Sequence, residues 1–164
     1  MSKADLDRLV AQFPEAIVSS HSSHGDDTAV VLVSRLVEVM RWLKNAAGFD
    51  FLVDVTAVDY LGRDLRFEVV YHLRSMKSGS RLRVKVQVAQ SEDGPAPEVP
   101  SMVTLWPTAN WLERETWDMF GIKFTGHPDL RRILLYEEFV GYPLRKDYPK
   151  EKRQPLIRRD YTME

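Results

Sequence analysis

Hydrophobic residues recur along this chain with two different periods, one typical of helices and one typical of strands. Leu36, Val37, Met40 and Leu43 repeat at helical spacing and place one apolar stripe on a single face. Pro107 suits the first turn of a later helix, and Gly121 suits its end. The pattern therefore predicts three helices, over residues 2–13, 34–46 and 107–120.

Strands are predicted in the middle of the chain, where apolar and polar residues alternate. Residues 65–74 and 81–89 alternate cleanly, while residues 51–59 are mostly apolar on both faces, as in a central strand covered from both sides. Because the turns between these strands are short, we expect an antiparallel meander. Shorter strands are predicted over residues 16–20 and 28–33, with loops over residues 21–27 and 90–100.

From Gly121 onward the sequence follows neither period. Glycines and prolines break it into extended pieces, and arginines and aromatic residues are frequent among them. The predicted fold is α+β: an antiparallel sheet with helices packed on one face, followed by an extended C-terminal arm. We expect residues 1–120 to form a globular domain and residues 121–164 to form an arm and basic tail used for contacts with other subunits.

The helix predicted over residues 107–120 has an unusual distribution of charge. Its apolar arc is expected to contain Trp111, Leu112, Glu115, Met119 and Phe120. A carboxylate in such an arc needs a cationic partner, so we expect Glu115 to pair with Arg131 or Arg132. On the opposite side, Arg114 and Asp118 are spaced as a local ion pair.

Composition narrows the possible functions. The chain has no cysteine, which excludes disulfides, thiolate metal sites, cysteine-ligated iron–sulfur clusters and a cysteine nucleophile. Its formal net charge of -1 gives no electrostatic reason to expect a nucleic-acid partner. No apolar run is long enough to cross a bilayer, and the polar start of the chain is unlike a secretory signal.

Catalysis is the alternative to a role in association. Glu113, Glu115, Asp118 and His127 could be the acids and the histidine of a metal-dependent hydrolase. On a helix, however, Glu113 points away from Glu115, so the group does not converge. Arginine, tyrosine and phenylalanine in the arm are residue types that anchor interfaces, which favours an interaction module over an enzyme.

Five blocks of sequence in the C-terminal third carry a family resemblance. They are ERE at 113–115, WDMFG at 117–121, FTGHP at 124–128, LRRIL at 130–134 and GYPLRKDYP at 141–149. Together they resemble the signature of the 30 kDa subunit of respiratory complex I, which is the C subunit of bacterial NADH-quinone oxidoreductase. Tyr142 stands where many members of that family carry a histidine.

The resemblance implies a cofactor-free structural subunit in the hydrophilic arm of a proton-translocating NADH:quinone oxidoreductase. Flavin and iron–sulfur clusters would lie in partner subunits, and no active site is expected in this chain. Its partners would be the 49 kDa-type D subunit and the cluster-bearing subunits, on the cytoplasmic side of the cell membrane. The equivalent subunit of a membrane-bound hydrogenase or of a plastoquinone-reducing complex is the alternative that the same signature allows.

The resemblance also suggests which residues contact other subunits. The expected interface comprises Glu113, Glu115, Trp117, Asp118, His127, Arg131, Arg132, Pro143, Leu144, Arg145, Lys146, Asp147 and Tyr148. Arg145 is expected to reach a partner carboxylate, so its replacement by alanine should weaken assembly and leave the melting temperature of the isolated chain nearly unchanged.

Overall fold

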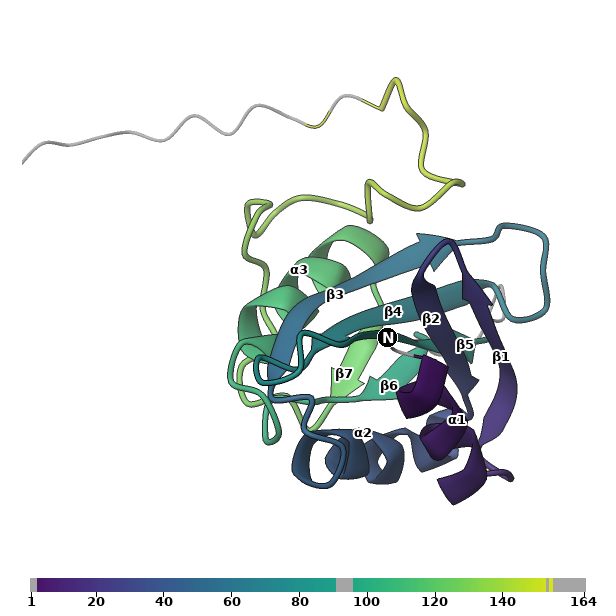
Figure 1. Cartoon of the computed structure of the whole chain (residues 1–164). Coiled ribbons are helices and arrows are strands. Elements are labelled where there is room, and N and C mark those ends of the chain that lie inside the picture. Colours follow the sequence, from purple (N-terminus) through teal and green to yellow (C-terminus); the bar gives the residue numbers. More distant parts are fainter. Residues whose placement is uncertain (1–2, 91–95, 153, 155–164) are drawn as a thin grey trace, which may run out of the picture.

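The fold combines three α-helices with one large and one small sheet among the residues described. A computed structural model describes residues 3–90, 96–152 and 154 of the 164-residue chain (Figure 1). The elements follow in this order: α1 (Lys3–Gln12), β1 (Ile17–Ser23), β2 (Asp26–Val31), a 3-10 turn (Val33–Arg35), α2 (Leu36–Asn45), β3 (Phe51–Asp59), β4 (Phe67–Arg74), β5 (Arg81–Val88), β6 (Glu98–Pro100), α3 (Ala109–Phe120) and β7 (Lys123–Thr125). The predicted α+β class is confirmed.

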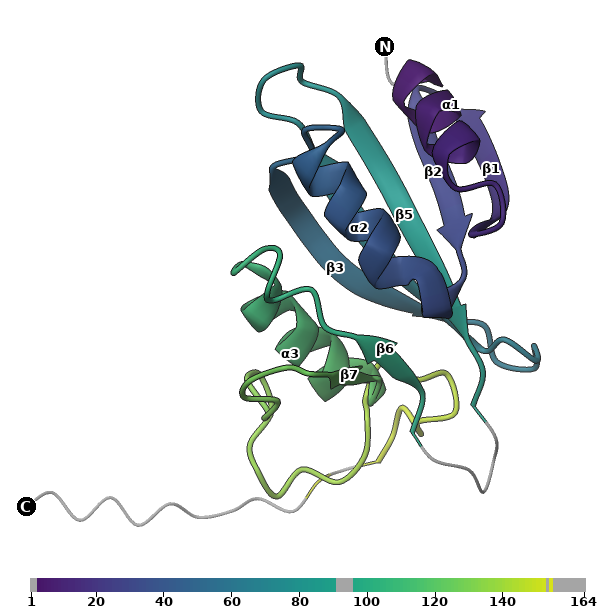
Figure 2. The same ribbon diagram turned by 90° about the horizontal axis from the view of Figure 1, so that it is seen from below.

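The large sheet has five strands in the order β1-β2-β5-β4-β3. Strands β3, β4 and β5 form the predicted antiparallel meander. Strand β2 pairs in parallel with β5, however, so the sheet is mixed and not purely antiparallel. The chain leaves β2, crosses through α2 and enters β3 at the far edge, which leaves β2 beside the last strand of the meander (Figure 2).

A tight turn replaces most of the polar loop predicted over residues 21–27. Strands β1 and β2 are antiparallel, and only His24 and Gly25 separate them. Both residues have positive φ, 54° and 86°, as in the two-residue turns whose twist matches that of the flanking strands. The strand pair therefore extends to Ser23 and Asp26.

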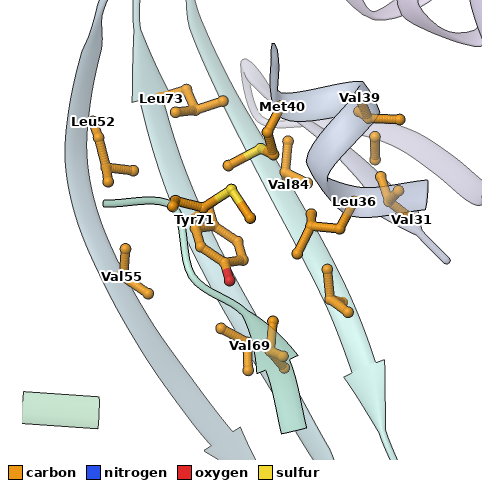
Figure 3. Packing of buried hydrophobic residues seen from close by; sticks show 14 of the residues in the cluster. Val31, Leu36, Val39, Met40, Leu52, Val55, Val69, Tyr71, Leu73 and Val84 are labelled. Atoms are coloured by element: carbon orange, nitrogen blue, oxygen red, sulfur yellow. The ribbon is translucent and has the colours of Figure 1, made fainter. Parts of the chain in front are cut away.

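Helices α1 and α2 cover one face of the large sheet (Figure 2). The predicted stripe of α2 is buried there, with Leu36, Met40 and Leu43 fully covered. Figure 3 shows Leu36 and Met40 directed toward Tyr71 and Val84 of the sheet. The helices and this face of the sheet thus enclose one continuous apolar core.

Strand β3 is an edge strand, so its prediction as a doubly covered central strand is wrong. Its burial alternates along the strand, and Phe51 and Val53 are 43% and 48% exposed. Helix α3 lies against β3, and the hydroxyl of Thr116 donates to the carbonyl of Val55 over 3.0 Å. The strand buried on both faces is β4.

The small sheet brings residues beyond position 120 into the core. Strand β6 lies in the predicted loop 90–100 and pairs in parallel with β7, contrary to the expectation of no pairing there. Val99 and Phe124, which face each other in this pair, are 0% and 2% exposed. The division of the chain at residue 120 stays a prediction. None of the helices in the described ranges is long and apolar enough to span a membrane.

Candidate functional site

Helix α3 ends where the following chain folds back over it. Gly121 has a φ of 71°, and its N–H donates to the carbonyl of Trp117. A Cβ at this position would lie 2.5 Å from the ring of Tyr142 and 2.6 Å from a guanidinium nitrogen of Arg145. The sequence therefore needs glycine here both for the backbone conformation and for the close approach of residues 142–145.

Asp118 is the acceptor that organises the returning chain. Its carboxylate, fully buried, accepts hydrogen bonds from the N–H groups of Ile133, Leu134 and Leu135 at 3.1, 2.9 and 2.9 Å. Arg132 adds an ion pair at 2.5 Å. Burial by itself would raise the pKa of Asp118, but these donors together hold it below its usual value. One helical side chain thus fixes four consecutive residues of the arm.

Two arginines complete this attachment. Arg114 donates to the carbonyls of Arg131 and Arg132, each over 3.2 Å, and its guanidinium lies 5.2 Å from the centre of the Trp111 ring. The predicted local pair of Arg114 with Asp118 is wrong, because both side chains are engaged by residues 131–135.

Arg132 lies inside a cluster of aromatic rings. It donates to the carbonyls of Phe139 and Gly141 at 2.9 and 3.3 Å, so it joins the early and late parts of the arm. Its guanidinium also lies within 5.8 Å of the ring centres of Trp117, Phe139 and Tyr142. These contacts give the irregular arm a defined path across α3.

A second attachment joins the arm to the end of the large sheet. Asp59 accepts two hydrogen bonds from Arg66, at 2.9 and 2.8 Å, and one from the N–H of Lys146 at 2.8 Å. Arg66 also pairs with Asp147 at 2.8 Å. Burial opposes the ionisation of Asp59, but Arg66 and Lys146 lower its pKa. This network was not predicted, although the opposite charges of Asp59 and Arg66 on either side of a turn were a usable signal.

Arg145 has an intramolecular position that the sequence did not reveal. Its Nε donates to the carbonyl of Phe120, the last residue of α3, and its guanidinium lies over the rings of Tyr142 and Phe67 at 4.6 and 5.2 Å. Burial lowers the pKa of Arg145. The side chain therefore closes the C-terminal end of α3, and the expectation that its removal leaves the isolated fold unaffected no longer follows.

Glu113 is buried and Glu115 is exposed, which is the reverse of what the helical pattern predicted. Glu113 is fully buried and accepts hydrogen bonds from the Ser101 hydroxyl and the Met102 N–H, each over 2.6 Å. Burial raises its pKa to about 7. Glu115 is exposed and forms no ion pair within the described part of the chain, so its predicted pairing with Arg131 or Arg132 is wrong.

The residues of the hydrolase alternative do not come together. Glu113 binds the loop before α3, Asp118 binds the arm, and Glu115 faces solvent. His127 occupies a turn, where its Nδ1 accepts from the N–H of Asp129 at 3.0 Å and its Nε2 lies 3.1 Å from the carbonyl of Asn110. Among residues 3–90, 96–152 and 154, no three histidine or acidic side chains are grouped to hold a metal.

A shallow groove lies between α3 and the arm. Its volume is about 600 Å³, and its walls include Arg114, Trp117, Leu130, Ile133 and Tyr136. Large apolar side chains protrude from the same helix and arm: Trp111 is 62%, Leu134 61% and Leu144 55% exposed. The helical pattern placed Trp111 in the apolar arc that faces the core. Its side chain is exposed instead, so this side of α3 is a surface that the helical pattern did not predict.

The predicted interface residues fall into two groups. Some lie exposed on the arm or on α3: Glu115, Arg131, Leu144, Lys146 and Asp147. The others are partly or fully covered within the chain: Glu113, Trp117, Asp118, His127, Arg132, Pro143, Arg145 and Tyr148. Contact of either group with another protein stays a prediction, and the second group also makes contacts within the chain that the sequence did not indicate.

Comparison with protein families gives a match over most of the chain. The family described as respiratory-chain NADH dehydrogenase, 30 kDa subunit, matches residues 29–154, a span that begins within β2 and includes β3, β4, β5, α3 and the described arm.

Individual relatives agree with this match. The C subunit of NADH-quinone oxidoreductase from Roseiflexus sp. (strain RS-1) is 51% identical over 146 residues, which cover 88% of this chain and 82% of the relative. The C 2 subunit of NADH-quinone oxidoreductase from Rhizobium etli (strain CIAT 652) is 45% identical over 154 residues, covering 90% and 80% of the two chains.

Solved structures show the same fold. A trypsin-resistant fragment of Nqo5 superimposes with a TM-score of 0.66 and 38% identity, covering 78% of this chain and 98% of the fragment. A chain of an archaeal membrane-bound sulfane sulfur reductase superimposes with a TM-score of 0.77 over 92% of this chain and 86% of its own length. At 24% identity, that second similarity concerns the fold alone.

Proposed function

The chain belongs to the family of the 30 kDa subunit of respiratory-chain NADH dehydrogenase, and we propose that it acts there as a structural subunit without a cofactor of its own. Its relatives are subunits of NADH-quinone oxidoreductase, so its partners are other subunits of a complex I-type assembly. We assign it to the hydrophilic arm, where it would hold the quinone-proximal and cluster-bearing subunits together, with the 49 kDa-type D subunit as a direct neighbour.

The observation that carries this proposal is the surface formed by α3 and the arm. Trp111, Leu134 and Leu144 expose large apolar side chains on α3 and the arm, and arginines line the groove between these two segments. Exposed large apolar side chains, with tryptophan and arginine on the same surface, are typical of protein interfaces. Because Asp118 and Arg132 fix the arm, this surface is largely formed before a partner arrives, which lowers the entropy cost of binding.

Two features of the residues support the proposal that this chain binds no cofactor: the lack of cysteine and the separate contacts of the acidic residues and the histidine. Without cysteine, the chain lacks the usual ligands of iron–sulfur clusters. The acidic residues and histidine that were candidates for a metal site are used separately, by the loop before α3, by the arm and by a turn. We therefore propose that electrons pass through partner subunits while this chain maintains their arrangement, and that it lies on the cytoplasmic side as a peripheral component of the membrane complex.

The test compares two double variants of the full chain in cells that carry the complete complex. Trp111→Ala with Leu134→Ala removes two of the most exposed apolar side chains of the surface, and Leu61→Ala with Met76→Ala removes side chains of similar exposure elsewhere. We expect the first pair to reduce the assembled complex on native gels and the NADH:quinone activity of membranes at least tenfold, and the second pair to change neither. Equal assembly of both variants would contradict the proposal.

A further inference from the structure

One edge strand of the large sheet is covered by a helix, and the other has an unpaired outer side. At one edge, α3 lies against β3 and Thr116 supplies a hydrogen bond to the backbone of Val55. At the other edge, β1 pairs with β2 only, and no element among residues 3–90, 96–152 and 154 pairs with its outer side. An unpaired strand edge presents a row of backbone donors and acceptors that can bind another extended chain.

Strand β1 also lacks most features that keep exposed edges from pairing. Residues 18–23 are all exposed, and the strand contains no lysine, arginine, acidic residue or proline. A bulge between Ile17 and Ser19 interrupts the strand at its start, which leaves Ser19–Ser23 as a regular segment. The four serines of this segment have short side chains that leave the backbone accessible.

The turn between β1 and β2 determines which amides face outward. In a two-residue hairpin the residues that flank the turn, Ser23 and Asp26, form a hydrogen-bonded pair. Because such pairs alternate along antiparallel strands, His21 and Ser19 also point their backbone groups toward β2. The N–H and C=O groups of Ser20 and Ser22 therefore point to the free side.

We propose that Ser19–Ser23 of β1 binds an extended segment of another subunit of the same complex, which adds a sixth strand to the sheet. This inference rests on the proposed function, because it needs a partner that is already present in the assembly. Recognition would come mainly from the backbone, through the outward groups of Ser20 and Ser22, and the serine side chains would impose little sequence selectivity.

A second copy of this chain is a poorer occupant of the same edge. The side chains beside the edge are four serines and one histidine, so two copies joined here would bury little apolar surface. A stable interface needs about 1,000 Å² of well-packed surface, and one isolated strand pair is marginal in water. A partner subunit that is held at the α3–arm surface and is long enough to reach the opposite edge of the sheet has a raised effective concentration at β1, so a weak strand pairing becomes sufficient.

Hydrogen exchange resolved to single amides tests the inference on the full chain, free and within the purified complex. We expect the amides of Ser20 and Ser22 to exchange at least tenfold more slowly in the complex, together with amides of residues 130–148. Protection of residues 130–148 without protection of Ser20 and Ser22 would overturn the β1 inference and leave the proposed function standing. Protection of neither region would refute both, and concentration-dependent protection in the free chain would show self-association instead.

A proline variant separates backbone pairing from side-chain contact. Ser22→Pro removes the outward N–H, and proline is tolerated on the free side of edge strands, whereas Ser22→Ala keeps that N–H. In complexes that carry Ser22→Pro, we expect the protection of Ser20 to fall at least fivefold, while Ser22→Ala retains it. Equal protection of Ser20 in the two variants would contradict pairing through the backbone, and the wild-type comparison decides the question if the proline variant does not fold.

Discussion

Replacing Asp118 by asparagine should detach the arm from α3. The substitution keeps the size of the side chain but removes the charge that pairs with Arg132 and accepts three backbone N–H groups. Removing one partner of a buried ion pair costs about 3–5 kcal/mol, because the other charge stays buried. Asparagine keeps one carbonyl oxygen as an acceptor, so we expect the lower end of that range.

A loss of about 3 kcal/mol is large for a chain of this size. Typical domains are stable by about 5–15 kcal/mol, and 1 kcal/mol corresponds to about 2–4 °C in melting temperature at 150–250 residues. We therefore expect the isolated Asp118→Asn chain to melt roughly 10 °C below the wild type. Trypsin should also cleave faster after Arg131 and Arg132, because Asp118 pairs with Arg132 and accepts from the N–H groups that follow it.

The control is Asp129→Asn, which breaks the exposed pair of Asp129 with Arg131. An exposed pair contributes about 0–1 kcal/mol, so this variant should melt within about 3 °C of the wild type.

The pKa of Asp118 is lowered in the fold, so the stability that Asp118 contributes is present above its unfolded pKa and is lost as pH falls through its folded pKa. Melting temperatures of wild type and Asp118→Asn that agree at neutral pH would refute this account of the arm.

Two further substitutions have defined outcomes in the isolated chain. Because the pKa of Glu113 is raised to about 7 from 4.5, the fold should lose about 3 kcal/mol as pH rises from 4.5 to 7; denaturant titrations should show this slope in the wild type and a much flatter one in Glu113→Gln. Arg145→Ala should lower the melting temperature by several degrees, since the carbonyl of Phe120 loses its donor and two rings lose their cover; a thermal scan that matches the wild type would contradict this role.

The hydrophobic periodicity and the turn residues correctly predicted the elements that pack against their neighbours in sequence. The stripe of α2 and the meander of β3, β4 and β5 follow from periodicity and short turns. The parallel pairing of β2 with β5 depends on strands more than 50 residues apart, as the register of Thr28 with Arg83 illustrates, and no local pattern encodes it.

Helix α3 illustrates why the site was harder to predict than the fold. Periodicity assigned Trp111 and Glu115 to the buried side, but the buried side contains Glu113, Thr116 and Asp118. These polar residues tolerate burial because backbone groups of Met102, Val55 and residues 133–135 bond to them. The sequence feature that pointed to this site was the presence of three acidic residues in one short helix. The backbone N–H groups from which Glu113 and Asp118 accept hydrogen bonds are known only from the folded structure.

The central claim is that this chain is a structural subunit of a complex I-type assembly and carries no cofactor itself. Native mass spectrometry of the assembly recovered from detergent-solubilised membranes through an affinity tag on this chain tests it most directly. We expect one copy of the chain at its bare sequence mass, released from an assembly that contains the 49 kDa-type D subunit and the flavin- and cluster-bearing subunits. Recovery of the chain alone, or with a flavin or cluster bound to it, would contradict the account.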